Sequence, residues 1–213
     1  MARVVALDVA GEQVVLRTDE GPDGYGRAPE GVDWQALAPH VVGRHAPERP
    51  DQLVALRADL AGADDAALAA VVNAAWDLAA RRAGVPLWRF LAGLSPEEVV
   101  ALVDFAPLSG LLTREEALDI LRRAEPTRAE RTAILALEGL PAVGDDDHVL
   151  PLDASGVDGN LALLLLAAKS GVPVRGVHEW SGHLSAFDYV AVSGADSGGV
   201  GDRYRAPTEP GLS

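Results

Sequence analysis

The segment Asp64–Ala83 carries the strongest helical pattern in the chain. Its apolar residues recur at the three- and four-residue spacing of one helix face, at Leu68, Val71, Val72, Ala75, Leu78 and Ala79. Gly84 and Pro86 follow directly and predict where the helix ends. Because an amphipathic helix must bury its apolar stripe against another element, this segment constrains how the rest of the chain can fold.

Two short strands are predicted ahead of this helix, at Arg3–Val9 and Gln13–Thr18, joined by a tight turn. The segment Asp19–Gly31 is rich in Gly, Pro and acidic residues, which predicts a loop. Trp34–Val42 is expected to form a short helix, and a second helix is expected to start near Asp51, whose side chain can accept the first backbone N–H groups.

Caps and apolar runs predict the elements that follow Gly84. The predicted helices are Pro86–Leu91, a turn opened by the capping box Ser95–Glu98, a helix from Thr113 to about Ala124, and Asn160–Ser170. The predicted strands are Val99–Phe105, Ala133–Leu137, Val149–Leu152 and Val172–Val177. Residues beyond Ser193 are expected to be loop. The pattern indicates a small α+β start followed by β-α-β units.

The charge of the chain is strongly acidic, with 32 Asp and Glu against 18 Lys and Arg and a formal net charge of −14. Nucleic acids and anionic membrane surfaces are bound through clusters of basic residues, so neither is expected as a partner. The longest apolar run, Leu161–Ala168, is too short to span a bilayer. With no cysteine and no apolar leader at the N-terminus, the chain is expected to be soluble and cytoplasmic.

Several stretches resemble one known family. Val71–Leu91 is similar to the helix pair that joins the cap to the barrel in the enolase superfamily (the mandelate racemase and muconate lactonizing enzyme group). Within that superfamily the resemblance narrows to the L-fuconate dehydratases, through Leu94–Glu98, Val103–Phe105 and Leu112–Leu118. The last third agrees in the same order, through Asn160–Val174, His183–Gly194 and Arg203–Gly211.

The resemblance implies an α+β, cap-like N-terminal region over residues 1–98 and an incomplete, rearranged α/β barrel over residues 99–213. A complete (β/α)₈ barrel typically needs about 250 residues, so the barrel is expected to be truncated. An open parallel sheet leaves apolar edges and faces uncovered. We therefore expect a homodimer or a higher homo-oligomer.

The segment between Leu121 and Val149 stands where the family carries its catalytic middle. Members of the family place a Lys-x-Lys pair on one barrel strand and metal-binding carboxylates on the next three, and the lysine removes a proton while Mg²⁺ stabilises the enediolate. The segment here contains no lysine, and Lys169 is the only lysine in the chain. Neither the base nor the metal site can be carried over, so no metal and no other cofactor is expected.

One acid/base pair of the family does have counterparts. In the family an Asp on a late strand holds a His on the next strand, and Asp153 matches that Asp while His178 follows the next predicted strand. His178 comes one residue later than the family spacing, which reverses a strand side chain unless a bulge absorbs the slip. The alternative is an inherited structural hydrogen bond or two unrelated loop residues.

Three further features are candidates for substrate or metal binding, and simpler explanations exist for them. Arg175 and Glu179 flank the same strand end, where Arg175 could bind a substrate carboxylate, although a surface arginine is the simpler interpretation. The acidic run Asp145–His148 has metal-ligand residue types, but adjacent residues on an extended loop point to alternate sides, which favours a solvated loop.

Two classes of function remain open. The first is a metal-independent lyase or isomerase that acts on a small hydroxy acid or related metabolite, with His178 as acid/base and Asp153 orienting it. The second is a non-catalytic module that binds a metabolite or a partner protein. The first is preferred, because the retained strands are those that carry the pair. It predicts the two side chains within hydrogen-bond reach in a pocket, and the second predicts them apart or without a cavity.

Overall fold

The computed structural model describes residues 2–11, 13–27, 32–141, 150–151, 157–171, 174–175, 203–204 and 206–211. These residues form two compact units. The first contains the described residues up to Phe90, together with Val157 and residues 208–211. The second contains the described residues between Leu91 and Pro207 other than Val157. The two units are described separately below.

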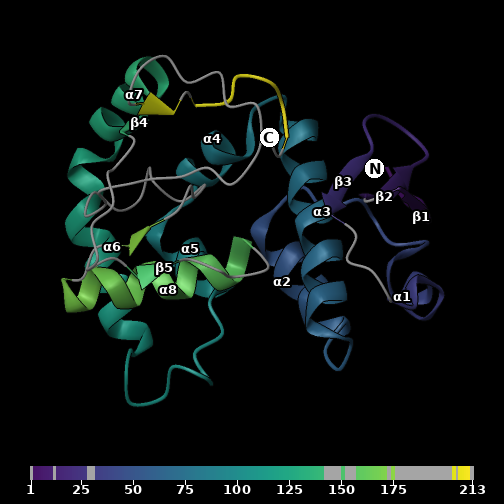
Figure 1. Ribbon diagram of the computed structural model, residues 1–213, viewed down its shortest axis with the longest axis horizontal. Helices are drawn as coiled ribbons and strands as arrows, with labels where there is room; N and C mark the ends of the chain where they lie inside the picture. Colours follow the sequence, from purple (N-terminus) through teal and green to yellow (C-terminus); the bar gives the residue numbers. More distant parts are fainter. Residues whose placement is uncertain are drawn as a thin grey trace. The chain divides into compact units, whose positions relative to one another are not determined.

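The first unit contains an antiparallel sheet in the order β1-β2-β3 (Figure 1). Strands β1 (Val4–Ala10) and β2 (Gln13–Thr18) confirm the two predicted strands. Strand β3 (Gly24–Arg27) lies within the segment predicted as a loop, so that prediction was wrong for these residues. The reason is a long-range contact: Gly24 and Gly26 let the strand lie directly on a helix, since a Cβ atom at either position would come within 2.2 Å of a helix carbonyl oxygen.

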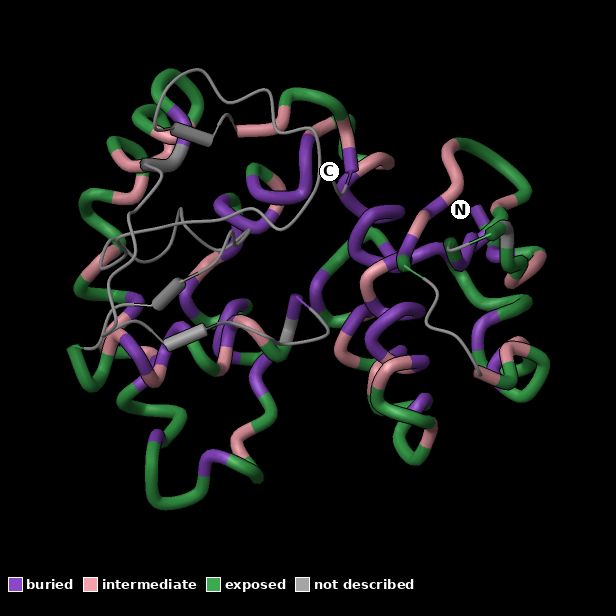
Figure 2. Tube along the Cα trace, in the orientation of Figure 1, coloured by how far each residue is buried: buried purple, intermediate pink, exposed green. Residues whose placement is uncertain are grey.

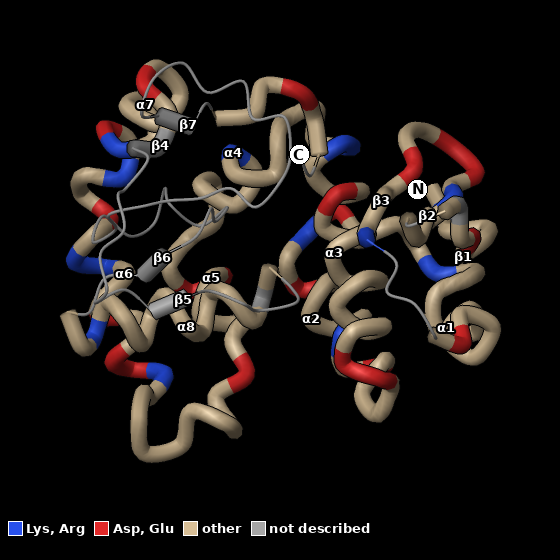
Figure 3. Tube along the Cα trace, viewed as in Figure 1, with Lys and Arg blue, Asp and Glu red and all other residues tan. Residues whose placement is uncertain are grey.

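That helix is α3 (Asp65–Ala83), which confirms the strongest sequence prediction. The Asp64 side chain accepts the N–H groups of Ala66 and Ala67 and so caps the start of the helix, where acidic residues gather (Figure 3). Gly84, at a φ of 70°, ends it in the left-handed conformation. Most of α3 is buried, from Ala67 to Ala80, as the long purple stretch in Figure 2 shows.

Three shorter helices were also predicted close to their observed limits: α1 (Trp34–Val41), α2 (Pro50–Asp59) and α4 (Leu87–Ala92). The start of α2 differs in detail from the prediction. Arg49 is its N-cap and Pro50 its first residue, in place of a cap at Asp51. Proline suits this position because its fixed φ fits a helix and its missing N–H is not needed there.

The second unit contains α5 (Pro96–Leu102), α6 (Arg114–Ala124), the 3₁₀ turn η1 (Glu125–Thr127), α7 (Arg128–Glu138) and most of α8 (Val157–Ser170). Both predicted capping boxes are confirmed. The Ser95 hydroxyl accepts the N–H of Glu98 and the Glu98 carboxylate accepts the N–H of Ser95, and Thr113 and Glu116 make the same exchange.

Two predicted strands in this unit are wrong. The apolar run Val99–Phe105 continues α5 up to Leu102, because the Ser95 cap starts a helix that the β-branched residues do not interrupt. The run Ala133–Leu137 lies inside α7, which begins at Arg128 directly after η1. A short apolar run has no period of its own that separates strand from helix, and in both cases the preceding helical turn decides.

Four two-residue strands complete the described part of the chain. Strand β4 (Leu140–Pro141) pairs antiparallel with β7 (Arg203–Tyr204), so the tail was wrongly predicted as loop at those two residues. Strand β5 (Leu150–Pro151) pairs parallel with β6 (Val174–Arg175), inside the predicted strands. The incomplete barrel beyond this pair stays a prediction. No helix in the described ranges is both long enough and apolar enough to cross a membrane.

Candidate functional site

The strands β5 and β6 are the elements that lead to the predicted acid/base pair. They pair parallel, with Leu150 opposite Val174 and Pro151 opposite Arg175, and α8 connects them in sequence. This is the β-α-β arrangement that the sequence predicts, with a helix as the crossover between parallel strands. The carboxyl ends of parallel strands meet at one edge of a sheet, where sites of α/β proteins lie.

The predicted site residues follow these strand ends. Asp153 comes two residues after β5, and His178 comes three residues after β6. Arg175 is the last residue of β6. The side chain of Arg175 and the whole of Asp153, His178 and Glu179 lie outside the described residues, as does Asp145–His148. The contact between Asp153 and His178 therefore stays a prediction.

Helix α8 buries one apolar face, although its sequence, apolar nearly all round, predicts a helix that is buried on every side. Leu161, Leu164 and Leu165 are fully buried. At its start, the N–H of Val157 donates to the side-chain oxygen of Asn73 on α3, over 3.1 Å. This bond satisfies one of the N–H groups that the first turn of a helix leaves without an internal acceptor.

The first unit holds one buried carboxylate, Asp77, among its described residues. Its Oδ2 atom accepts the backbone N–H of Tyr25 at 2.8 Å and the Nε–H of Arg81 at 2.7 Å. The guanidinium of Arg81 also lies 5.0 Å from the centre of the Tyr25 ring. The carboxylate thus joins β3 to α3, and since both contacts are within the protein, its role is structural.

The C-terminal residues of the described chain close over the same carboxylate. The Gly211 N–H donates to the Val85 carbonyl at 3.1 Å, and the Gly211 carbonyl accepts from Leu87 at 2.8 Å. Gly211 has a φ of 103°, and a Cβ atom there would stand 2.3 Å from Oδ1 of Asp77. Only glycine fits this position without displacing the buried carboxylate.

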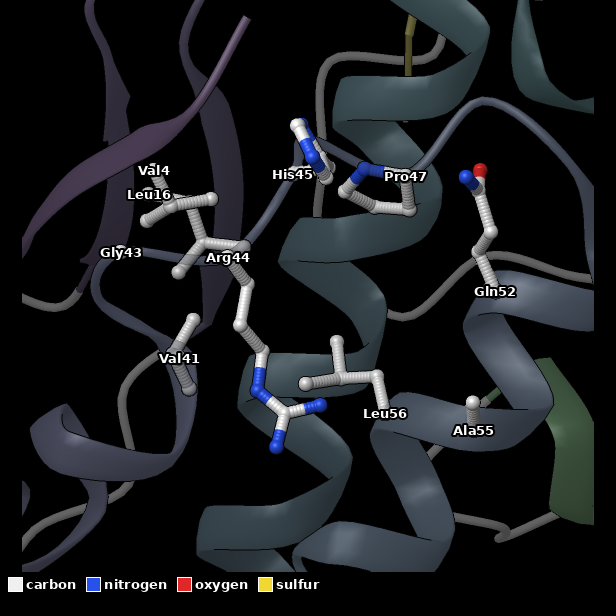
Figure 4. Close-up of a pocket in the computed structure, with 10 residues that line it drawn as sticks. All are labelled: Val4, Leu16, Val41, Gly43, Arg44, His45, Pro47, Gln52, Ala55 and Leu56. Carbon is white, nitrogen blue, oxygen red and sulfur yellow. The ribbon is translucent and has the colours of Figure 1, made fainter.

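A pocket of about 310 Å³ also lies in the first unit (Figure 4). Residues of β1, β2, α1, α2 and the connection between the two helices line it: Val4, Leu16, Val41, Gly43, Arg44, His45, Pro47, Gln52, Ala55 and Leu56. Its volume is at the lower end of the range for small-molecule sites. No sequence motif marks this pocket, because its walls come from segments far apart in the chain.

Residues 2–92 match the sequence model of a family described as the mandelate racemase/muconate lactonizing enzyme, N-terminal domain. The N-terminal region of the chain is therefore similar to the N-terminal domain of the enolase/mandelate racemase superfamily. The match agrees with the predicted α+β, cap-like N-terminal region, and it covers the sheet and helices α1 to α4 described above.

Similarity to two curated proteins is also found, and for the first of them it extends beyond the matched domain. The chain is 34% identical over 157 residues to mitochondrial enolase superfamily member 1 of Bos taurus, which covers 63% of this chain and 35% of that protein. It is 46% identical over 65 residues to the L-galactonate dehydratase of Hypocrea jecorina, which covers 30% of this chain and 14% of that protein. The chain therefore spans about a third or less of the length of these relatives.

A solved structure agrees at the level of the fold. The crystal structure of human mitochondrial enolase superfamily member 1 superposes with a TM-score of 0.53 and 24% identity. The superposition covers 82% of this chain and 48% of the human chain.

The only lysine of the chain is engaged in a surface contact between helices. The Lys169 Nζ atom, on the last turn of α8, lies 2.7 Å from the Glu116 carboxylate and 2.7 Å from the Leu111 carbonyl. The hydrogen bond from Lys169 to Glu116, together with the capping bond from the Thr113 N–H, lowers the pKa of Glu116. An ammonium group held by two oxygens in this way supports α6 and α8, and does not resemble the proton-abstracting lysine of the superfamily.

The described residues do not fit the Mg²⁺ ion that the superfamily resemblance implies. Within the part of the chain that the structure describes, no three His, Cys, Asp or Glu side chains come together to hold a cation. The one buried carboxylate among these residues, Asp77, is taken up by Tyr25 and Arg81. No step of the chemistry below is therefore derived through a metal.

Sequence reasoning overlooked two groups of residues in the first unit. Asp77 and Arg81 are four positions apart on α3, a spacing that predicts an ion pair, and a carboxylate in an otherwise apolar stretch was the available signal. The alternation of Gly24 and Gly26 around Tyr25 similarly marked a close backbone approach. Arg44 and His45 at the pocket carried no such signal.

Proposed function

We propose that this chain is an enolase-superfamily lyase or isomerase that acts on a small hydroxy acid, with His178 as acid/base and Asp153 as the group that orients it. The observation that carries the proposal is the parallel pairing of β5 with β6. It brings the segments that precede Asp153 and His178 to the same edge of a sheet, which is a precondition for their contact.

The proposed chemistry needs only these side chains. Asp153 accepts the Nδ1–H of His178, which leaves Nε2 of the neutral imidazole as the base. His178 removes the proton next to the substrate carboxylate. Returning that proton to a departing hydroxyl at the neighbouring carbon breaks the C–O bond and releases water, and returning it to carbon gives the isomer. Arg175 and Glu179 are proposed to bind the substrate, with Arg175 holding its carboxylate.

The relatives suggest which hydroxy acids to try first. One is named for dehydration of L-galactonate, and the short segments after the cap resemble the L-fuconate dehydratases. Sugar acids of this kind carry a hydroxyl beside the acidic carbon, as the proposed elimination requires. We propose this substrate class together with metal independence.

The test is turnover of a sugar-acid panel that includes L-galactonate and L-fuconate, followed by mass spectrometry for loss of water and by ²H exchange for isomerisation. His178→Gln is expected to lower the rate by at least about 100-fold, the usual contribution of a general acid/base. His40→Gln, an exposed histidine on α1, serves as the matched control and should retain full activity. Full activity of His178→Gln would refute the proposal.

The same activity assay in the presence of the chelator EDTA tests metal independence. Activity that survives EDTA is expected, and activity that returns only with added Mg²⁺ would contradict metal independence. Asp153→Asn is expected to lower turnover by a smaller factor than His178→Gln, and to shift the pH at which His178 titrates, because the carboxylate is a positioning group.

The contacts of Lys169 favour a second candidate, a non-catalytic module that binds a metabolite or a partner protein. With the only lysine of the chain paired to Glu116, the superfamily's lysine chemistry has no group to carry it. Sugar-acid binding by calorimetry without any turnover would support this second function over the first.

The proposed assembly is a homodimer or higher homo-oligomer, which would cover the edges of a short parallel sheet. Sedimentation velocity should show a species of at least twice the 22.2 kDa chain mass. A monomer at high concentration would contradict the proposal.

A further inference from the structure

The pocket of the first unit has an apolar floor and a basic rim. Val4, Leu16, Val41 and Leu56 are each at most 6% exposed and form the floor, from four different elements. Arg44 and His45 are exposed and stand at the opening. The pocket thus offers apolar surface that a ligand of matching shape would cover.

Two of the ten lining residues, Arg44 and His45, are basic in type, although the chain as a whole is acidic. None of the ten lining residues is Asp or Glu, while the net charge of the chain is −14. Figure 4 shows the Arg44 side chain extending toward Leu56, while the ring of His45 lies beside Pro47. A carboxylate is the ligand group that can accept from the guanidinium N–H groups that Asp59 does not use.

Two neighbouring contacts fix the polar groups in place. Asp59, at the end of α2, forms an ion pair with Nη1 of Arg44. A guanidinium carries five N–H donors, and this pair involves one of its three nitrogens. The Gln52 side-chain oxygen accepts the backbone N–H groups of Glu48 and Arg49. These bonds hold the side chains of Arg44 and Gln52 without a ligand, so binding loses little of their side-chain freedom.

We propose that this pocket binds a small carboxylic acid with an apolar body, whose ring or chain packs on Val41 and Leu56 while its carboxylate meets Arg44. A sugar acid, with a hydroxyl on most of its carbons, does not match these apolar walls. None of the lining residues takes part in the acid/base chemistry proposed above, so either proposal can fail without the other.

The experiment uses the full chain, with 2-naphthoate as the probe and backbone ¹H–¹⁵N shifts as the measurement. Saturable shifts at Gly43 and His45 are expected, with a Kd of about 1 mM or below for a ligand of this size. The uncharged 2-naphthamide should bind about tenfold more weakly, because it lacks the charge-assisted bond to Arg44. L-Galactonate at the same concentration should leave both amides unshifted.

Two alanines of α2 provide a matched pair of variants. Ala55 and Ala58 are both exposed, but only Ala55 lines the pocket, so Ala55→Leu fills it and Ala58→Leu does not. Ala55→Leu should weaken 2-naphthoate binding at least about tenfold, and Ala58→Leu should bind as the wild type does. Arg44→Gln should lower the affinity for 2-naphthoate to that of 2-naphthamide.

Three results would overturn the site. They are shifts that do not saturate, equal binding by Ala55→Leu and Ala58→Leu, and equal shifts at Gly43 and His45 with L-galactonate. Equal affinity for the acid and the amide would overturn the carboxylate class. Thermal unfolding of each variant checks that the fold is retained.

Discussion

The two units of this chain are stabilised in different ways. In the first, a sheet packs on α3 so closely that β3 can carry only glycine at two positions, and a buried carboxylate joins this strand to the helix. In the second, α5 and α6 are defined by local capping boxes, and α7 has no buried residue. Tertiary contacts thus determine the structure of the first unit, while local hydrogen bonds account for much of the described helix structure in the second.

If this comparison is right, a small change at the contact between sheet and helix should have the largest effect. Gly24→Ala places a Cβ atom 2.2 Å from the Ala74 carbonyl oxygen and 2.6 Å from the Leu78 Cβ. Because backbone atoms cannot move aside cheaply, the free energy of unfolding should fall by at least about 3 kcal/mol. Denaturant unfolding measures this loss.

The control for this change is Gly43→Ala. Gly43 has a φ of 85°, and a Cβ atom added there would meet nothing within 4 Å, so only backbone strain of about 1 kcal/mol is expected. A similar loss for both variants would show that close packing of β3 on α3 is not what the first unit depends on.

The next largest effect is expected at the buried carboxylate. Asp77→Ala leaves the Tyr25 N–H and the Arg81 guanidinium without their acceptor, and breaking such a pair costs about 3 kcal/mol where one partner is partly exposed, as Arg81 is at 32%. Asp65→Ala, an exposed acid in the first turn of the same helix, should cost only about 0.5 kcal/mol. Equal losses would argue against a structural role for Asp77.

The second unit should show the smallest effect, and one that depends on pH. Hydrogen bonds from Lys169 and then Thr113 hold the pKa of Glu116 below its ordinary value of 4.5. A carboxyl group with a lowered folded pKa stabilises the fold above its unfolded pKa, and this contribution disappears as the pH falls through the folded value. The loss is therefore expected below about pH 5.

Glu116→Gln isolates this contribution, because glutamine can still cap the helix but carries no charge. Its unfolding free energy should vary less between pH 6 and pH 3 than that of the wild type, whereas the neighbouring Glu115→Gln should follow the wild type. Amide hydrogen exchange in α6 and α8 locates the change. If the unfolding free energy of Glu116→Gln depended on pH as that of the wild type does, the Lys169–Glu116 pair would not contribute to the stability of the second unit.

The parts of the structure that could be predicted are those with local signals. Asp64 and Gly84 mark the two ends of α3, and the pairs Ser95–Glu98 and Thr113–Glu116 mark the starts of α5 and α6. Each signal acts within one helical turn, so the residues that make it are neighbours in sequence. The local signals failed where an apolar run followed a helical turn, as in α5 and α7, and where a glycine-rich segment predicted as loop forms β3.

The candidate site was predictable to the level of its strands. The run at Val149–Leu152 and the run at Val172–Val177 contain the strands that pair as β5 and β6. Pairing of parallel strands across a helix crossover is a strong general rule, which is why the arrangement could be expected from the order of elements. The contact between Asp153 and His178 is a matter of side-chain register, and it remains a prediction.

Taken alone, the amino-acid sequence determined both ends of α3, the capped starts of α5 and α6, the resemblance of the N-terminal region to its superfamily and the absence of a second lysine. The tertiary structure decided that a glycine-rich segment is a strand, that Asp77 meets Tyr25 and Gly211, and that Arg44 and His45 border a pocket. The physical reason is distance along the chain. A cap acts between residues three positions apart, whereas Tyr25 and Asp77 are 52 positions apart and meet only when burial of apolar surface brings their elements together.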